Sequence, residues 1–303
     1  MKILVTGGSG FIGKPVLKNL IKLDREIQIM NLSRSESSDD IEIKDYVHWL
    51  KCDLSDPETY INQVTDFAPH VVIHLAWEGI PNFSLQQCMK NINASVKFLE
   101  IVTSLESCQK IIVTGSCFEY GNKIGSCQEI DKADPKDSFT FAKKMILSFL
   151  ELECSKRSIT YCLARLFYVY GPNQRNGSLI PMLIDTLKKR NIPDLRTPKN
   201  ANDFIHVSDV AEAIFNMVTK EISSGIYNIG SGISTSVTEI SKKVELSLSK
   251  KLILTKQLIK NTITTEKKVD FWADMEKTKK AIDWSPKMSL NVGISKLVEN
   301  QNK

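Results

Sequence analysis

Three glycines at three-residue spacing stand near the start of the chain, directly after the apolar run 3–5 and at the opening of a helical pattern. This layout suits the diphosphate of a dinucleotide. Gly7 allows a tight turn, Gly10 lets the backbone approach the phosphates, and Gly13 lets the helix pack on the strand. The positive N-terminus of the helix would face the anion. The cofactor residues predicted in this turn are Gly7, Gly10, Phe11, Ile12 and Gly13.

The end of the second predicted strand bears on which dinucleotide is bound. About twenty residues after the glycines, a carboxylate that accepts from both ribose hydroxyls would favour NAD. Counting from Gly13 reaches Ser33 and then Arg34, and the run 30–35 contains no acidic residue. A small hydroxyl beside a guanidinium suits a 2′-phosphate. We therefore predict NADP as the cofactor. NAD is the alternative if Arg34 is only a solvated loop residue.

Composition indicates an ordinary globular enzyme. A chain of 303 residues can bury a large core and form one large and one smaller lobe. The net charge of +5 is modest, and lysine pairs gather in the C-terminal third. We interpret these as a solvated surface that could attract an anionic substrate, and we expect no nucleic-acid partner.

Cysteine usage and hydropathy favour a cytoplasmic protein without a membrane partner. Seven cysteines are an odd number without close paired spacing, which predicts reduced thiols. His74 and His206 are interpreted as structural residues of strand motifs, and His48 and His70 are not assigned as ligands, so no metal site is expected. No apolar run has membrane-spanning length, and the first strand follows Met1 without a signal peptide.

Strand and helix patterns alternate over the first half of the chain. Such alternation predicts an α/β fold with a doubly wound parallel sheet. Asp56 could cap the second of the helices. The predicted strands are 2–6, 27–32, 46–52, 71–76, 109–114 and 159–167, and the predicted helices are 11–23, 56–66, 85–106 and 138–156.

After residue 168 the alternation ends. A helix is predicted at 178–190, a strand at 203–207 and a helix at 208–219, and a further strand ends at the glycine turn 230–232. We predict a dinucleotide-binding domain formed by 1–168 plus 203–222. The smaller substrate-binding lobe would consist of 169–202 plus 223–303.

From end to end the chain resembles the extended short-chain dehydrogenase/reductase family, whose members are nucleotide-sugar epimerases, dehydratases and ketoreductases. The resemblance implies a Rossmann-type domain, a smaller substrate lobe and hydride transfer between a nicotinamide and a sugar carbon. It rests on Thr6–Gly13, Asp53-Leu54, His74-Leu75-Ala76, Asn91, Ser116, Tyr120-Gly121, Arg165–Pro172, Asp203–Ala211, Tyr227–Gly232 and Trp284-Ser285-Pro286.

In this family a tyrosine and a lysine handle the proton while a serine or threonine steadies the substrate oxygen. The resemblance assigns Ser116 and Lys143 to two of these roles, but Phe139 occupies the position of the tyrosine. A phenyl ring has no proton to give. Three explanations stand open. Another group supplies the proton, with Tyr120 as the first candidate beside Glu119 and Cys117; the protein binds without turnover; or a distant tyrosine, Tyr168 or Tyr170, acts.

The resemblance also implies the remaining contacts. Asp53 and Leu54 would meet the adenine, Leu75 and Ala76 the diphosphate and ribose, and Phe167 the nicotinamide end. Lys143 would also hold the nicotinamide ribose. The family often forms homodimers through the helix predicted at 85–106, and we expect the same here. The candidate substrate residues are Trp77, Tyr168, Arg175 and Asn202, the last standing where an arginine is common.

The segment after Ser116 separates the reactions of the family. Nucleotide-sugar 4,6-dehydratases carry an Asp-Glu pair where this chain has Cys117-Phe118, which disfavours elimination. The run 115–121 resembles that of 4-ketoreductases and 4-dehydrogenases acting on nucleotide-activated deoxysugars. We predict an NAD(P)-dependent oxidoreductase acting at C4 of a nucleotide-activated (deoxy)sugar, in surface-polysaccharide precursor synthesis. The alternatives are a nucleotide-sugar 4-epimerase and a cofactor-binding protein with little or no turnover.

Overall fold

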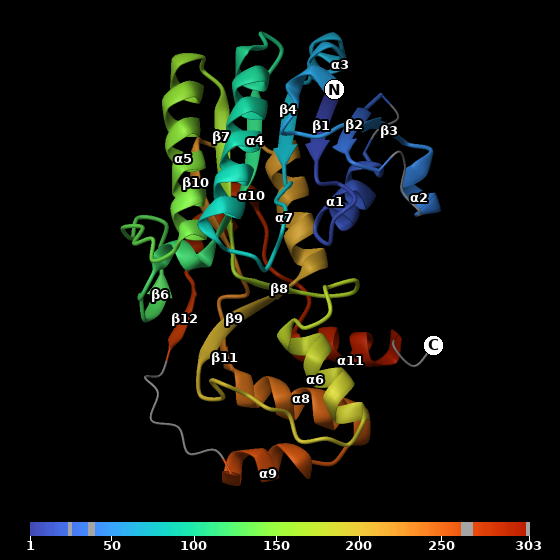
Figure 1. Ribbon diagram of the computed structural model, residues 1–303, viewed down its shortest axis with the longest axis vertical. Coiled ribbons are helices and arrows are strands. Elements are labelled where there is room, and N and C mark those ends of the chain that lie inside the picture. Colours follow the sequence, from blue (N-terminus) through green and yellow to red (C-terminus); the bar gives the residue numbers. More distant parts are fainter. Residues whose placement is uncertain (24–25, 36–39, 262–268, 301–303) are drawn as a thin grey trace.

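The computed structural model describes residues 1–23, 26–35, 40–261 and 269–300. Two sheets organise these residues. A large sheet with helices on both faces carries the N-terminal half, and a smaller sheet continues from it toward helices α6 (Leu179–Lys188), α8 (Val237–Ser249) and α11 (Leu290–Asn300) (Figure 1). The helix α9 (Leu254–Asn261) follows α8 along the chain. The predicted α/β fold with a doubly wound parallel sheet is confirmed.

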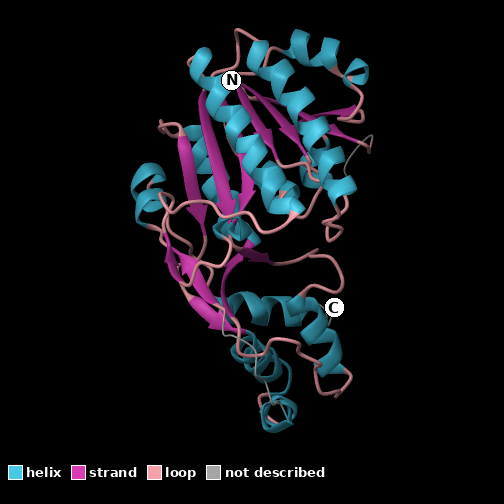
Figure 2. Ribbon diagram, turned by 60° about the vertical axis from the view of Figure 1, so that its left-hand side comes forward, coloured by secondary structure: helices cyan, strands magenta, loops and turns pink. Residues whose placement is uncertain are grey.

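The large sheet has seven strands in the order β10-β7-β5-β4-β1-β2-β3, and every neighbouring pair is parallel. The order reverses between β1 and β4, which makes their shared carboxyl edge the place where such sheets bind ligands. Figure 2 shows these strands running side by side between helices. The strands are β1 (Lys2–Thr6), β2 (Gln28–Ser33), β3 (Val47–Lys51), β4 (Val71–His74), β5 (Lys110–Ser116), β7 (Thr160–Leu166) and β10 (Gly225–Ile229).

Alternate side chains of the central strands face two separate apolar cores. On β5, Ile112 belongs to one core, whereas Ile111 and Val113 belong to the other. Helices α1 (Gly13–Leu20) and α7 (Val207–Thr219) cover the first core, and α4 (Leu85–Ser104) and α5 (Ser138–Lys156) cover the second. Because both faces are covered, the strands are apolar almost throughout, as parallel strands usually are.

The smaller sheet has the order β11-β9-β12-β6, with β8 (Tyr168–Tyr170) paired to β9 (Ala201–His206). The other strands are β11 (Ser234–Ser236), β12 (Asp270–Ala273) and β6 (Gly125–Cys127). A third apolar core joins Phe204 of β9 to α6, α8 and α11. Two strands lie outside the sheet that the predicted domain division implied. The strand β10 falls in 223–303 but joins the large sheet, and β6 falls in 1–168 but joins the smaller sheet. Strand pairing, not sequence order, decides which sheet a strand enters.

Most elements predicted for the first 168 residues are present, and their ends lie within a few residues of the predicted ones. The sequence patterns did not predict several short elements. These are α2 (Ile41–Lys44), β6 and β8. The expectation that Asp56 caps a helix is wrong: it precedes the 3₁₀ turn η1 (Pro57–Thr59) without a side-chain bond, and α3 (Ile61–Phe67) begins later. Asp137, by contrast, caps α5 by accepting a hydrogen bond from the Thr140 amide at 2.8 Å.

All seven cysteines are buried free thiols. Within the part of the chain that the structure describes, no helix combines the length and apolar character needed to cross a membrane.

Asp203 joins the two sheets. It lies on β9, is fully buried, and accepts hydrogen bonds from the Ser231 and Gly232 amides after β10 and from the Ala273 amide of β12. The Ser231 hydroxyl donates to the same carboxylate at 2.6 Å. A charged acceptor with this many donors holds three segments together.

We expect Asp203→Ala to lower the free energy of unfolding by about 3 kcal/mol or more, because one buried and two partly buried amides lose their acceptor. Urea denaturation measures the loss. Asp185→Ala is the matched control, since Asp185 lies on the surface of α6 and pairs with Lys189 one turn later. Equal stability of the two variants would contradict the assigned role of Asp203.

Candidate active site

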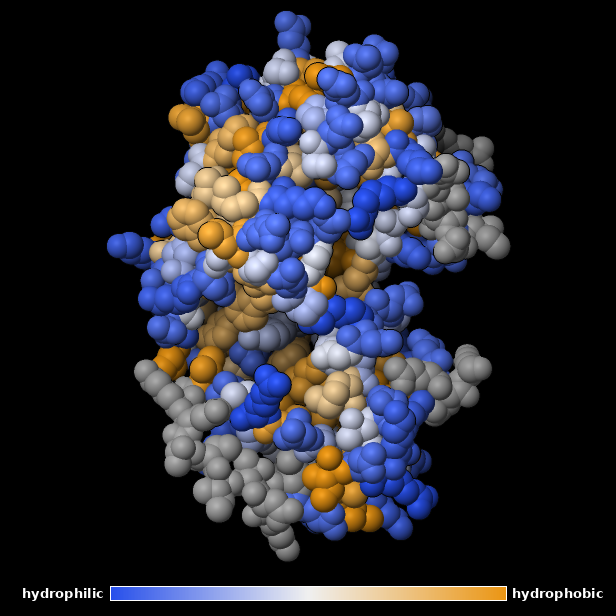
Figure 3. Space-filling model, viewed as in Figure 1, coloured by the Kyte–Doolittle hydropathy of each residue, from blue (hydrophilic) through white to orange (hydrophobic). Residues whose placement is uncertain are grey.

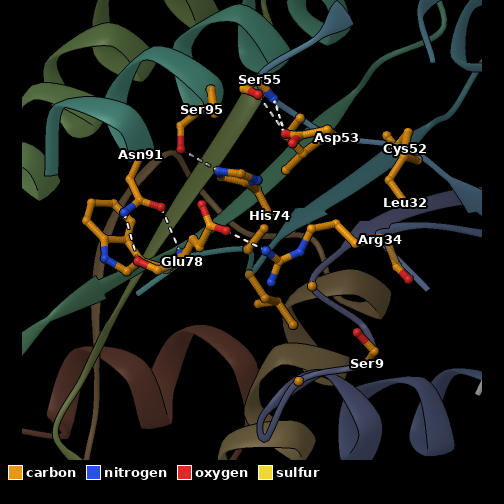
Figure 4. A pocket seen from close by; sticks show the side chains of 18 of the residues that line it. Ser9, Leu32, Arg34, Cys52, Asp53, Ser55, His74, Glu78, Asn91 and Ser95 are labelled. Carbon is orange, nitrogen blue, oxygen red and sulfur yellow. Dashed lines mark hydrogen bonds and ion pairs between the residues drawn. The ribbon is translucent and has the colours of Figure 1, made fainter. Parts of the chain in front are cut away.

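A cavity of about 240 Å³ opens at the carboxyl ends of β1, β2, β3 and β4 and is bordered by α4. Figure 4 shows side chains from these elements converging on it. The predicted cofactor residues that line it are Gly7, Gly10, Ser33, Arg34, Asp53, Leu54, Leu75 and Ala76. The predicted substrate residue Trp77 lines it as well.

The turn after β1 is wound tightly against the segment that follows β4. Gly7 has a φ of +74°, and a Cβ there would come within 2.8 Å of the Ala76 amide nitrogen. A Cβ on Gly13 would lie 2.1 Å from the Gly7 carbonyl oxygen. No side chain caps the start of α1. A close backbone turn followed by an uncapped helix N-terminus is the cradle that a dinucleotide diphosphate requires, so these residues fit the predicted cofactor.

His74 connects three elements at the floor of the cavity. Its Nδ1 lies 2.7 Å from the Thr6 hydroxyl, and its Nε2 lies 3.0 Å from the Ser95 hydroxyl of α4. The ring also stacks on Phe98. Burial lowers the pKa of His74 to about 3, so the imidazole stays neutral at physiological pH. With both ring nitrogens engaged, His74 links the ends of β1 and β4 to α4.

The rim of the cavity carries the charged groups. Arg34 follows β2 and pairs with Glu78, which lies beyond the end of β4. The Asp53 carboxylate accepts hydrogen bonds from the Ser55 amide and hydroxyl at 2.8 and 2.7 Å. These bonds lower the pKa of Asp53. The Ser33 hydroxyl donates to the Ser35 carbonyl oxygen at 2.8 Å.

The Lys143 side chain reaches the carboxyl end of β5, the strand that Ser116 ends. The Lys143 ammonium, from α5, donates to the carbonyl oxygen of Thr114 at 2.9 Å, two residues before Ser116. It also lies 4.0 Å from the centre of the Trp77 ring, a cation–π contact. Burial lowers the pKa of Lys143 to about 8, although Glu119 opposes the shift. Ser116 ends the strand and accepts a hydrogen bond from the Phe118 amide at 3.3 Å.

Phe139 lies one turn before Lys143 on α5 and is buried among apolar side chains. Its ring meets Trp77 edge-on with centroids 5.3 Å apart, and it packs on Phe83 at 4.7 Å. Cys88 and Ile92 of α4 complete this cluster. The position that a tyrosine holds in the family is thus filled by an aromatic contact without an ionisable group.

The structure does not bring Tyr120 to this place. Its hydroxyl donates to Asn228 at 2.7 Å inside the core that α1 and α7 cover, and its ring lies against Arg165. Burial raises the pKa of Tyr120. The geometry therefore speaks against Tyr120 as the proton donor.

The other candidate proton donors also pack in the interior of the protein. Glu119 is fully buried, accepts from the Ser116 amide at 2.7 Å and pairs with Arg165 at 3.0 Å. Burial raises the pKa of Cys117 well above its ordinary value. Tyr168 packs among Phe118, Phe204 and Phe271. Tyr170 is buried, and its hydroxyl has no hydrogen-bond partner among the described residues.

The remaining predicted residues are scattered. Phe167 packs against Tyr120 and Phe271 in the core and does not line the cavity. Arg175 is exposed in the loop after β8. The Asn202 side-chain oxygen on β9 is buried without a partner among the described residues, which leaves an acceptor near Tyr168 and Phe271.

Sequence reasoning missed several cavity residues. Glu78, Lys90, Ala94 and Ser95 all line the cavity. The three on α4, Lys90, Ala94 and Ser95, lie at helical intervals of four and five residues, and this spacing is the signal that could have revealed them. Their role depends on how α4 lies beside β4, which no local pattern states.

The fold and the site define a class: enzymes with a Rossmann-type domain that bind a nicotinamide dinucleotide at the carboxyl edge of a parallel sheet. The model of the NAD dependent epimerase/dehydratase family matches residues 3–230, and the chain belongs to this family. The resemblance to extended short-chain dehydrogenases/reductases is thereby confirmed.

Similar proteins of known activity act on nucleotide sugars. The dTDP-4-dehydro-6-deoxyglucose reductase of Escherichia coli is 27% identical over 316 aligned positions, which cover 98% of this chain and 96% of that protein. The GDP-6-deoxy-D-talose 4-dehydrogenase of Aggregatibacter actinomycetemcomitans is 26% identical over 248 positions, covering 79% of this chain and 78% of that protein.

Solved structures share the fold. The dTDP-glucose 4,6-dehydratase of Bacillus anthracis, in complex with NAD, superposes with a TM-score of 0.83 at 22% identity and covers 100% of this chain and 96% of its own. MoeE5, in complex with UDP-glucuronic acid and NAD, gives a TM-score of 0.82 at 21% identity and covers 100% of this chain and 99% of its own.

Burial of Lys143 predicts a specific dependence of stability on pH. Its pKa is about 8 in the folded protein and 10.5 when exposed, so the unfolded chain binds more protons between these values. The stability of the wild type should therefore rise with pH relative to Lys143→Met, by up to about 3 kcal/mol toward pH 10.5. Urea denaturation of both proteins between pH 7 and 10 tests this, and parallel curves would contradict it.

Proposed function

We propose that the protein is an NADP-dependent oxidoreductase acting at C4 of a nucleotide-activated deoxysugar, in the synthesis of surface-polysaccharide precursors. The observation that carries the proposal is the Lys143 ammonium at the carboxyl end of β5, bonded to Thr114 two residues before Ser116 and lying against Trp77, which lines the dinucleotide cavity. The activities of the similar reductase and 4-dehydrogenase support reaction at C4. Elimination is disfavoured, because Cys117 and Glu119 are buried and Glu119 is already paired.

Ser116, Lys143 and the bound cofactor have different roles in the proposed reaction. A bound nicotinamide supplies or accepts the hydride. The half-buried Ser116 hydroxyl, at the carboxyl end of β5, orients the sugar carbonyl. The Lys143 ammonium donates one hydrogen bond to the Thr114 carbonyl oxygen. It replaces the missing tyrosine as the general acid and transfers a proton to the sugar carbonyl oxygen. The neutral amine then regains a proton from water. A pKa of about 8 suits this role near neutral pH.

The proposal includes the cofactor and the lobes. Arg34 at the end of β2, without a carboxylate on that strand, favours NADP, whereas two solved neighbours contain NAD. The large sheet would bind the dinucleotide. The smaller sheet with Tyr168, Arg175 and Asn202 would bind the nucleotide sugar, in a cytoplasmic enzyme.

A panel of dTDP-, CDP-, GDP- and UDP-linked 4-keto sugars tests the reaction by loss of NADPH absorbance. We expect at least one to be reduced, at a rate that falls as pH rises through about 8, because a neutral amine is a far weaker acid than an ammonium. Phe139→Tyr should raise kcat by about tenfold or more by restoring a phenol beside Lys143. Tyr120→Phe is the matched control and should leave kcat nearly unchanged.

Two results would contradict this reaction. Coenzyme binding without turnover in the wild type, with activity only in Phe139→Tyr, would favour the cofactor-binding protein. Interconversion of C4 epimers without net consumption of coenzyme would favour the 4-epimerase.

We also propose a homodimer that pairs through α4 and α5. These helices pack side by side and expose Leu85, Met89, Phe141 and Met145. Apolar surface gathers over this part of the molecule in Figure 3. Two such helix pairs could bury these side chains in a four-helix arrangement.

Light scattering coupled to size exclusion tests the dimer. Phe141→Glu should convert dimer to monomer, because Phe141 is 52% exposed at the centre of this surface. Ile130→Glu is the control, since Ile130 is 88% exposed but lies in the loop after β6. A monomeric wild type would refute the pairing.

A further inference from the structure

The Glu78 carboxylate lies between two cations that come from different elements. Arg34, just after β2, reaches across the cavity to Glu78, as Figure 4 shows. Lys90, on the second turn of α4, places its ammonium 2.8 Å from the other oxygen of the same carboxylate. All three residues line the dinucleotide cavity. The structure thus shows an anion held by a pair of cations at the rim.

The acidic member of this trio is anchored and the basic members are not. The Glu78 amide donates to the Asn91 side-chain oxygen at 2.7 Å, and the Asn91 amide group donates back to the Glu78 carbonyl oxygen at 2.9 Å. The Arg34 and Lys90 side chains are 71% and 52% exposed, against 35% for Glu78. The two cations can therefore turn toward another anion at the rim while Glu78 stays near its present place.

We propose that Arg34 and Lys90 together bind the 2′-phosphate of NADP, and that Glu78 is the competing anion which sets how strongly NADP is preferred over NAD. The inference rests on the proposed function, which places the adenosine ribose at the end of β2. Without a 2′-phosphate, Glu78 keeps both cations paired. With one, the phosphate takes them from Glu78.

The charges at the rim explain why this competition is finely balanced. Arg34 and Lys90 face two carboxylates, Glu78 and Asp53, so the group is close to neutral without ligand. Asp53 is further held by Ser55. Exposed ion pairs contribute little each, so a phosphate with more charge and more acceptor oxygens can displace Glu78 from both cations. Removing the Glu78 charge should leave a net positive charge at the rim and strengthen phosphate binding.

Calorimetric titration with 2′,5′-ADP and 5′-AMP isolates the phosphate, since these probes differ only at the 2′ position. Lys90→Gln should weaken 2′,5′-ADP about five- to tenfold and change 5′-AMP less than twofold. Glu78→Gln, which keeps the side-chain shape, should tighten 2′,5′-ADP about three- to tenfold and leave 5′-AMP unchanged. Lys189→Gln is the control: Lys189, at the end of α6, pairs with Asp185 on the surface and does not line the cavity.

The inference would be overturned if Lys90→Gln weakened the binding of 2′,5′-ADP and 5′-AMP equally, or if Glu78→Gln weakened the binding of both. Either result would mean that the three residues stabilise the rim of the cavity and do not recognise the 2′-phosphate. Titration of the wild type with NADPH and NADH distinguishes failure of the proposed function from failure of this inference. If neither coenzyme binds, the proposed function fails. If NADPH binds more tightly than NADH and neither variant changes the ratio, only the role of Lys90 and Glu78 fails.

Discussion

The close backbone approach between the turn after β1 and the segment after β4 is the constraint on which the site depends. A side chain at Gly7 would collide with the Ala76 backbone, and one at Gly13 would collide with Gly7 itself. This contact sits where the strand order reverses, so it fixes the start of α1 beside the cavity. His74, bonded to Thr6 and Ser95, ties α4 to the same point.

Buried charge shapes the second half of the site. Glu119 is held between the Ser116 amide and Arg165, and this fixes the backbone that presents Ser116. Lys143 is buried with a single carbonyl acceptor and an indole face, and its lowered pKa follows from that poor solvation. In the function proposed above, the burial that lowers the pKa of Lys143 would let it act as the acid that Phe139 cannot supply.

The charged groups at the rim of the cavity differ from Lys143 in their contact with water. At the catalytic end, Lys143 is desolvated and its pKa falls, because few groups compensate its charge. At the rim, Arg34, Lys90, Glu78 and Asp53 remain close to water and compensate one another. Exposed pairs exchange partners at low cost, which suits recognition of a ligand phosphate, whereas buried groups are held in one arrangement, which suits proton transfer.

The sequence by itself determined the alternating strands and helices and the glycine turn, because each is a local pattern that follows from steric and hydrophobic rules. The resemblance to the family added that Phe139 stands where a tyrosine is usual. Tertiary structure alone decided that Tyr120 turns into the core toward Asn228, that β6 joins β12, and that Glu78 meets both Arg34 and Lys90. These outcomes depend on strand order and helix placement. They join residues far apart in the chain, and no spacing along the sequence encodes that distance.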